Sequence, residues 1–218
     1  MRVVNDSFES VPMTDRKNAI RRAYDAIADD YLDERSAEPP ATPLLDDFAD
    51  RLPAGARVLD AGCGAGTPIA ARLASSLAVV GVDFSIEQVR RARENVPEAR
   101  FAQGDMTHLS FAADSFDAIC ALYSLIHVPM DDHPRVVREF HRVLRPGGLV
   151  LLSIGSEEWD GSNPDWLDTG VEMHWSFPDP ETSIDHLTGA GFEILERHTV
   201  EDELGGAFPI LLAKNPDP

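Results

Sequence analysis

The stretch V-L-D-A-G-C-G-A-G-T, residues 58–67, decides the fold. Its alternating glycines, Gly62, Gly64 and Gly66, directly follow a short apolar run that is typical of a buried strand. Glycine lets the backbone approach a ligand closely, and a helix that follows such a turn points its free N–H groups at that ligand. We therefore expect a cofactor beside this turn. A dinucleotide is a poor match, because Thr67 stands where the G-x-G-x-x-G fingerprint has its third glycine.

Aspartates mark the ends of the first three predicted strands. Asp60 places a carboxylate at the glycine turn, which is unfavourable beside a pyrophosphate and favourable beside an ammonium or sulfonium group. Asp83, 23 residues further on, can accept both hydroxyls of a ribose. Asp105 can accept from an adenine amino group, and Met106 offers a polarizable contact to the ring. Each aspartate alone is more often a cap or turn residue, but three in register predict one crevice.

Apolar runs alternate with helical patterns through the middle of the chain. The predicted strands cover residues 57–60, 78–83, 100–105, 116–124 and 149–154. The helices between them run to about residue 76 and over residues 85–94 and 132–144. Short apolar strands separated by helices predict a parallel sheet that is covered on both faces, with right-handed crossovers.

The two ends of the chain differ from this pattern. Residues 1–16 show no clear period and are expected to be a loose leader. Apolar and aromatic residues from Ile20 to Tyr31 recur at spacings of four, three and four, which predicts an amphipathic helix over 17–33, and a second helix is predicted over 44–51.

Beyond residue 154 we expect a loop over 155–178, a helix over 181–190 and two strands, 192–200 and 207–214. The connection between these two strands is too short for a crossover helix, so they are predicted to pair antiparallel.

Composition favours one folded domain that does not bind nucleic acid. The 218 residues include 43% apolar side chains, and 38 acidic against 19 basic ones give a formal net charge of −19. Binding a polyanion requires clustered Lys and Arg, which the sequence lacks. Only two basic residues are lysines, a bias that resembles proteins adapted to high salt. An acidic surface that attracts a basic partner is the alternative interpretation.

Targeting signals and paired cysteines are not evident. No apolar run approaches the about 20 residues of a membrane-spanning helix, and residues 1–10 lack the apolar stretch of a secretory signal, so we expect a cytoplasmic protein. Cys63 and Cys120 lack disulfide or zinc-site spacing and are expected to be small buried residues, with no metal site. Four further histidines are expected to be solvated: His133, His141, His186 and His198.

Residues 57–154 resemble the class I S-adenosylmethionine-dependent methyltransferases, of the small-molecule type related to quinone-biosynthesis methyltransferases. The resemblance rests on V-L-D-A-G-C-G-A-G, V-V-G-V-D-F-S, F-A-Q-G-D-M, F-D-A-I and L-R-P-G-G. It implies an α/β fold: a three-layer, Rossmann-like doubly wound sheet of seven strands, mostly parallel, with an antiparallel C-terminal hairpin and an N-terminal helical lid. Two regions follow, a leader with lid helices over 1–52 and the cofactor-binding domain over 53–218, with a substrate loop at about 155–178.

The resemblance also implies roles for individual residues at the cofactor. The methionine portion is expected at Asp60, Gly62, Gly64 and Gly66, the ribose at Asp83, and the adenine at Asp105 and Met106. Further cofactor contacts are expected from Phe84, Leu122, Tyr24 and Tyr31. The two tyrosines resemble a lid, and the alternative is that they only anchor their helix to the sheet.

Methyl transfer from a sulfonium is an in-line displacement that depends mainly on positioning, with a general base if the acceptor is a hydroxyl. His127, which follows the fourth strand, is the candidate base, unless it only packs against the next helix. Tyr123 either orients the acceptor or fills the crevice, and His174 is a second candidate base. The tryptophans of the predicted loop either line the acceptor pocket or act as staples that hold the loop against the rest of the protein: Trp159, Trp166 and Trp175.

The expected activity is methyl transfer from S-adenosyl-L-methionine to a small molecule, which leaves S-adenosyl-L-homocysteine. The expected partners are the small-molecule substrate only, with no nucleic acid and no membrane, in a monomer or a homodimer. The alternatives are a dehydrogenase-like nucleotide binder and a non-catalytic sensor or partner subunit that binds the same cofactor. Methylation of protein or tRNA is a third alternative, which the lack of a basic surface disfavours.

Overall fold

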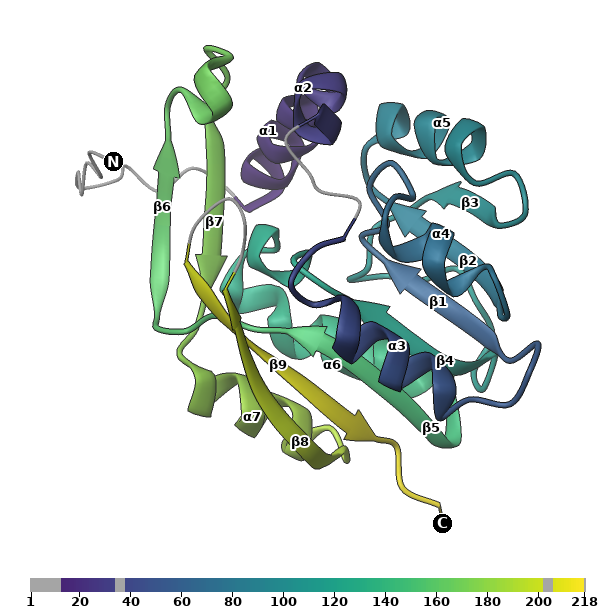
Figure 1. The fold of residues 1–218 in the computed structure, drawn as a ribbon. Helices are drawn as coiled ribbons and strands as arrows, with labels where there is room; N and C mark the ends of the chain where they lie inside the picture. Colours follow the sequence, from purple (N-terminus) through teal and green to yellow (C-terminus); the bar gives the residue numbers. More distant parts are fainter. Residues whose placement is uncertain (1–12, 34–37, 202–205, 218) are drawn as a thin grey trace.

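A seven-stranded sheet in the order β3–β2–β1–β4–β5–β9–β8 runs through the molecule (Figure 1). The computed structural model describes residues 13–33, 38–201 and 206–217. The strands are β1 (Arg57–Ala61), β2 (Ala78–Asp83), β3 (Arg100–Gln103), β4 (Phe116–Ala121), β5 (Leu144–Ser153), β8 (Glu193–Glu201) and β9 (Ala207–Lys214). Strand β9 is antiparallel to both of its neighbours and the other pairs are parallel, which confirms the predicted fold class.

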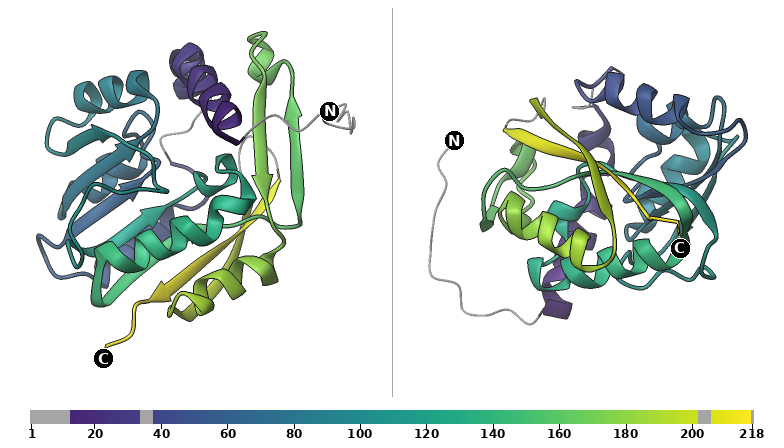
Figure 2. Two further views of the ribbon diagram at one scale, coloured as in Figure 1. Left: turned by 180° about the vertical axis from the view of Figure 1, so that it is seen from behind. Right: turned by 90° about the horizontal axis from the view of Figure 1, so that it is seen from below.

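Helices cover both faces of this sheet, and Figure 2 shows the two layers from behind and from below. One face packs against α3 (Thr42–Asp50), α4 (Ile69–Leu73) and α5 (Ile86–Asn95), and the other against α6 (His133–Val143) and α7 (Pro180–Gly189). Each layer has its own buried cluster, with Phe48 and Leu73 on the first face and Phe140 and Leu187 on the second. Apolar strands buried on both sides are what a parallel sheet requires.

The predicted helix over 17–33 is divided into α1 (Met13–Ala26) and α2 (Ala28–Asp33). Helical hydrogen bonds continue across the bend, from the N–H of Ile27 to the carbonyl of Ala23 and from the N–H of Tyr31 to that of Ile27. The expectation of a leader over residues 1–16 is wrong for residues 13–16, which begin α1, and residues 1–12 lie outside the described residues.

Residues 155–178 are not the loop that the sequence predicts. They contain an antiparallel hairpin of β6 (Trp159–Asn163) and β7 (Met173–Phe177), separate from the main sheet. The segment contains glycine, aspartate and asparagine, which are rare in strands, so the alternation of apolar and polar residues that marks a strand is not visible in its sequence. The hairpin packs through Met173 against Ile20 and Tyr24 of α1, in a third apolar cluster that a local pattern cannot reveal.

Smaller differences concern strand ends and histidines. β4 ends at Ala121 and β3 at Gln103, and β5 begins at Leu144 instead of at residue 149 as predicted. The expectation that His133 is solvated is wrong: it is buried, its Nε2 lies 3.0 Å from the carbonyl oxygen of Val128, and burial lowers its pKa. The other three histidines expected to be solvated are partly buried.

In the parts of the chain that the structure describes, no helix is both long and apolar enough to cross a membrane.

Candidate active site

The candidate site lies where the direction of strand order reverses. From β1 the chain proceeds to β2 and β3 on one side, and then returns to β4 and β5 on the other side of β1. Open α/β sheets bind ligands beyond the carboxyl ends of the strands at such a reversal. A cavity opens there, with up to about 1140 Å³ of empty space including the part open to solvent.

The glycine turn after β1 brings bare backbone to the cavity wall. Gly62 has a φ of +81°, and a Cβ atom added to it would overlap the Cβ of Ser124, which follows β4. Gly62 and Gly64 line the cavity, whereas Gly66 does not. Gly66 instead packs against α5, where an added Cβ would lie 3.2 Å from the Cβ of Ala92. The first two glycines therefore shape the site, and the third lets α5 pack against the turn.

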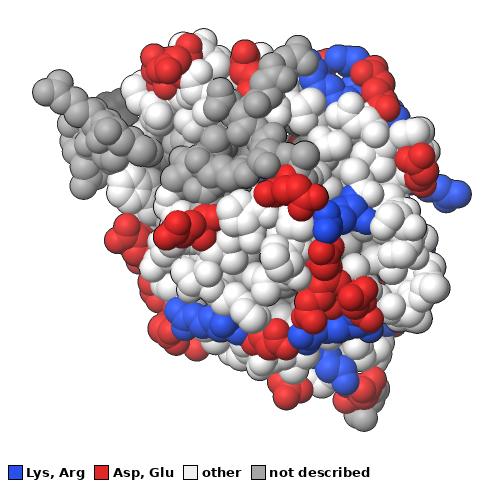
Figure 3. Space-filling view, in the orientation of Figure 1, with Lys and Arg blue, Asp and Glu red and all other residues white. Residues whose placement is uncertain are grey.

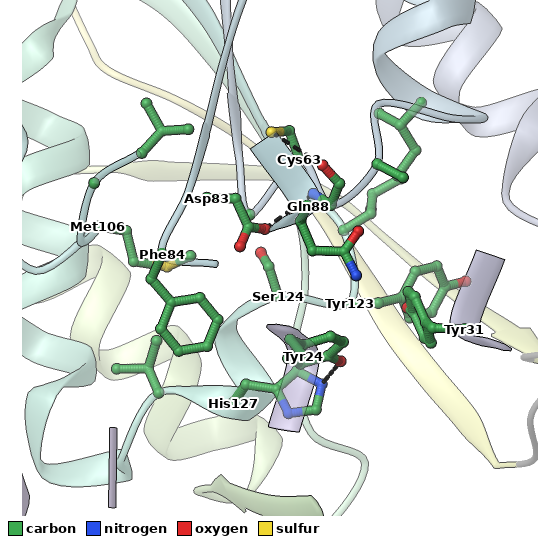
Figure 4. Close-up of a pocket in the computed structure, with 18 of the residues that line it drawn as sticks. Tyr24, Tyr31, Cys63, Asp83, Phe84, Gln88, Met106, Tyr123, Ser124 and His127 are labelled. Atoms are coloured by element: carbon green, nitrogen blue, oxygen red, sulfur yellow. Dashed lines mark hydrogen bonds between the residues drawn. The ribbon is translucent and has the colours of Figure 1, made fainter. Parts of the chain in front are cut away.

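Asp83 is fixed at the end of β2 by backbone donors. Its Oδ2 accepts from the N–H of Gly64 at 3.0 Å (Figure 4). Its Oδ1 accepts from the N–H of Ser85 at 2.8 Å. Burial raises the pKa of Asp83 to about 6, against the lowering effect of these hydrogen bonds. Each carboxylate oxygen retains a lone pair, so the group can accept from two neighbouring hydroxyls of a ligand.

Asp60 differs from its predicted position, since it is not among the residues that line the cavity. It is 1% exposed, and its Oδ2 has no hydrogen-bond partner among the described residues. Burial, followed by the charge of Asp83, raises the pKa of Asp60 to about 7. The acid at the first turn is thus enclosed in the protein.

The cavity is also lined by Phe84, Asp105 and Met106, as the sequence predicts, and by Lys17 of α1, which the sequence does not predict. Burial raises the pKa of Asp105, but hydrogen bonds from Thr107 and Lys17 outweigh it, so the net shift is downward. The ammonium group of Lys17 lies 3.3 Å from the Asp105 carboxylate and 2.7 Å from that of Asp132.

Gln88 is a lining residue that the sequence does not single out as part of the site. Its backbone N–H donates to Oγ of Ser85, the N-cap of α5, at 3.1 Å. The Gln88 side chain itself lines the cavity, 1% exposed, and neither its amide oxygen nor its nitrogen has a hydrogen-bond partner among the described residues. Because unpaired buried amides are costly, this side chain fits a polar ligand in the cavity.

His127, at the end of the short helix η1 (Leu125–His127), joins the cavity to α1. Its Nε2 lies 2.7 Å from the phenolic oxygen of Tyr24 (Figure 4). Its Nδ1 lies 3.1 Å from the backbone carbonyl oxygen of His174. Tyr24 and His127 both line the cavity and are both buried. The ring of Tyr31 also lines it, 5.4 Å from that of Tyr24 between centroids.

Among the other predicted site residues, Leu122 and Tyr123 line the cavity. The imidazole of His174 does not; its Nε2 lies 3.5 Å from a carboxylate oxygen of Glu172, and burial lowers its pKa despite that neighbour. The three tryptophans do not line it either. Trp166 and Trp175 pack edge to face, 5.3 Å apart, which supports the staple interpretation.

Comparisons with known proteins give one consistent picture. Residues 58–148 match the model of a methyltransferase domain. The chain is 39% identical over 158 residues to 27-O-demethylrifamycin SV methyltransferase of Amycolatopsis mediterranei, a match that covers 62% of this chain and 57% of that protein. It is 29% identical over 171 residues to tRNA (carboxymethyluridine(34)-5-O)-methyltransferase of Arabidopsis thaliana, covering 78% of this chain and 39% of that one.

One solved structure resembles the fold over nearly its whole length. It is 1,6-didemethyltoxoflavin-N1-methyltransferase of Burkholderia thailandensis with bound 1,6-didemethyltoxoflavin and S-adenosylhomocysteine, with a TM-score of 0.76 at 20% identity over 99% of this chain and 95% of that one. This likeness concerns the fold alone. The chain spans 57% of the rifamycin-related protein, so the match covers only part of that enzyme.

Proposed function

Since the chain belongs to the class I S-adenosylmethionine-dependent methyltransferases, we propose that it transfers a methyl group from S-adenosylmethionine to a small-molecule acceptor. The observation that carries the proposal is the composition of one cavity. It combines the Gly62–Gly64 backbone and the Asp83 carboxylate with a buried tyrosine–histidine pair. The first group of residues fits a nucleoside ligand and the second fits proton transfer.

The lining residues fit S-adenosylmethionine in chemical type. Asp83 would accept from the ribose hydroxyls, and Asp105 with Met106 would meet the adenine. Gln88 offers an amide that has no partner among the described residues, and Gly62 presents bare backbone at the cavity wall. When bound, the cofactor supplies an electrophilic methyl group on a sulfonium. The protein's part is to hold the acceptor in line with that methyl and to exclude water.

Charge supports a small acceptor over RNA, although one relative acts on tRNA. The chain carries 38 acidic and 19 basic side chains. On the face drawn in Figure 3, the Lys and Arg side chains of the described residues stand beside acidic ones and form no continuous basic strip. RNA binding depends on such a strip to neutralise phosphates, so this surface favours a small molecule.

Two measurements test the proposal. Calorimetric titration with S-adenosylhomocysteine should give saturable binding, whereas NADH should not bind. Incubation with methyl-labelled cofactor and a fractionated cell extract should then yield a labelled small molecule. Binding without any labelled product would favour the non-catalytic sensor, and label in RNA would contradict the small-molecule acceptor.

A further inference from the structure

The protonation state of His127 is determined by what surrounds it. Its Nδ1 lies 3.1 Å from the backbone carbonyl oxygen of His174, and a carbonyl oxygen can only accept. Nδ1 therefore carries the ring proton, and in the neutral imidazole Nε2 has the lone pair. The phenol of Tyr24, 2.7 Å away, donates to that lone pair.

This arrangement has a consequence for the candidate base. An imidazole nitrogen has one lone pair in the ring plane, and the Tyr24 hydroxyl already occupies that of Nε2. Through the described residues, a proton from a bound acceptor reaches His127 by way of the phenolic oxygen, because a hydroxyl that donates can also accept and Tyr24 lines the cavity.

We infer that Tyr24 and His127 act as a relay in which the Tyr24 phenol, and not the histidine, receives the proton of a neutral hydroxyl acceptor. This inference rests on the proposed function and adds the acceptor class and the order of proton transfer. Tyr24 is the catalytic residue, and His127 is a positioning residue that acts through it.

The lining charges indicate why the acceptor is neutral. Lys17 is paired with Asp105, and Asp83 is held by two backbone donors, so the charged side chains among the described lining residues belong to the cofactor end. The remaining described lining is apolar, aromatic or uncharged polar apart from His127 itself. For an ionised carboxylate, the described lining offers no cation in that part of the cavity. A neutral amine needs no proton removed before it attacks. A neutral hydroxyl does need a base.

The transfer balances without a further reactant. The acceptor O–H gives its proton to the Tyr24 oxygen while the Tyr24 proton moves to Nε2 of His127. An oxygen lone pair forms the new bond to the methyl carbon as the carbon–sulfur bond breaks and its electron pair returns to sulfur. The products are a methyl ether, a neutral thioether and an imidazolium, which later releases its proton to solvent.

Two substitutions separate this relay from a merely structural contact. Tyr24→Phe keeps the ring that packs in α1 and removes the hydroxyl. His127→Gln places an amide oxygen that can still accept from Tyr24 but cannot take up a proton. His198→Gln is the matched control, because His198 lies on β8 and does not line the cavity.

The first readout does not depend on turnover. 4-Nitrophenol, whose phenolate is yellow, is titrated with pH while bound to the S-adenosylhomocysteine complex. In the wild type and in His198→Gln the phenolate should form at lower pH than in free solution, because the relay takes the proton. In Tyr24→Phe and His127→Gln the midpoint should rise toward that of the free compound.

The second readout is methylation of substituted phenols. With 4-methylphenol, which stays protonated, both variants should lose about a hundredfold or more in kcat, the usual contribution of a general base. With pentafluorophenol, which is already ionised, the loss should be within a few-fold.

The outcomes distinguish the two proposals. If S-adenosylhomocysteine fails to bind the wild type, the proposed function itself fails. If it binds, the relay is overturned when 4-nitrophenol does not bind, when its titration midpoint is the same in wild type and His127→Gln, or when no phenol is methylated. The methyltransferase proposal survives each of those results, because a different acceptor atom would explain them.

Discussion

The backbone N–H of Gly64 donates to a carboxylate oxygen of Asp83 at 3.0 Å, so the turn after β1 and the acid at the end of β2 form one rigid unit. Because the same carboxylate also receives the N–H of Ser85, its position is fixed before any ligand arrives. Preorganisation of this kind reduces the entropy that binding must overcome.

Asp83→Ala should therefore weaken binding of S-adenosylhomocysteine by about 1–3 kcal/mol, because buried polar partners lose their acceptor. Calorimetric titration measures the change. Asp185→Ala on α7 is the control, because it removes one carboxylate from a residue that does not line the cavity. Unchanged affinity in Asp83→Ala would contradict the ribose role.

Asp60 should make stability depend on pH in a defined direction. Burial raises its pKa from 3.8 to about 7, so between these values the unfolded carboxyl is ionised while the folded one is protonated. The folded state then binds more protons, and its free energy of unfolding falls as pH rises through this window.

An asparagine does not titrate, so Asp60→Asn should not lose stability as pH rises through this window. At about pH 8 the variant should be more stable than the wild type by as much as about 4 kcal/mol, since each pKa unit corresponds to about 1.4 kcal/mol. The difference should disappear below about pH 4. Urea unfolding at several pH values measures it. A stability difference that does not change with pH would show that the Asp60 pKa is not raised.

Gly62→Ala should destabilise the fold, since its φ of +81° is unfavourable for alanine and the new Cβ would overlap that of Ser124. Left-handed strain and overpacking together predict a loss of about 2–5 kcal/mol. Thermal unfolding measures it, with Gly189→Ala on α7 as the control, because an added Cβ there meets no atom within 4 Å. Adding Ser124→Gly to Gly62→Ala should restore part of the loss by removing the overlapping atom.

The net charge of −19 predicts a salt-dependent stability. At about 1 M salt the Debye length falls to about 3 Å, so repulsion among the surface carboxylates is screened. The melting temperature should rise steadily as KCl increases toward molar concentration. A flat or falling curve would instead favour an acidic surface meant for a basic partner.

The sequence revealed the parts of the site that depend on local pattern. Glycines after one strand and an aspartate at the end of the next are recognisable because a few adjacent residues determine them, and Gly62, Gly64 and Asp83 do line the cavity. Asp60 fits the same pattern yet is enclosed, because the direction of a side chain depends on packing as well as on its place in a motif.

Long-range contacts were beyond prediction. The Tyr24–His127 hydrogen bond joins residues 103 positions apart, and Lys17 meets Asp105 across 88. The β6–β7 hairpin resembles a loop in composition. Its contact with α1, through Met173, exists only in the folded molecule. Gln88 stands three residues after the N-cap of α5, and its local sequence gives no sign that its side chain faces the cavity. That Tyr24 and Tyr31 contact the cofactor stays a prediction.

The third apolar cluster, which joins Ile20, Tyr24 and Ile27 to Met173, is distinct from the two that hold the sheet together. Helix α1, which carries Tyr24, can therefore separate locally while the central sheet stays folded, since local opening requires less free energy than global unfolding. The same local opening that exposes the amides of α1 to hydrogen exchange would also widen the way out of the cavity that Tyr24 lines, so under the proposed function the α1 segment would set the rate of product release.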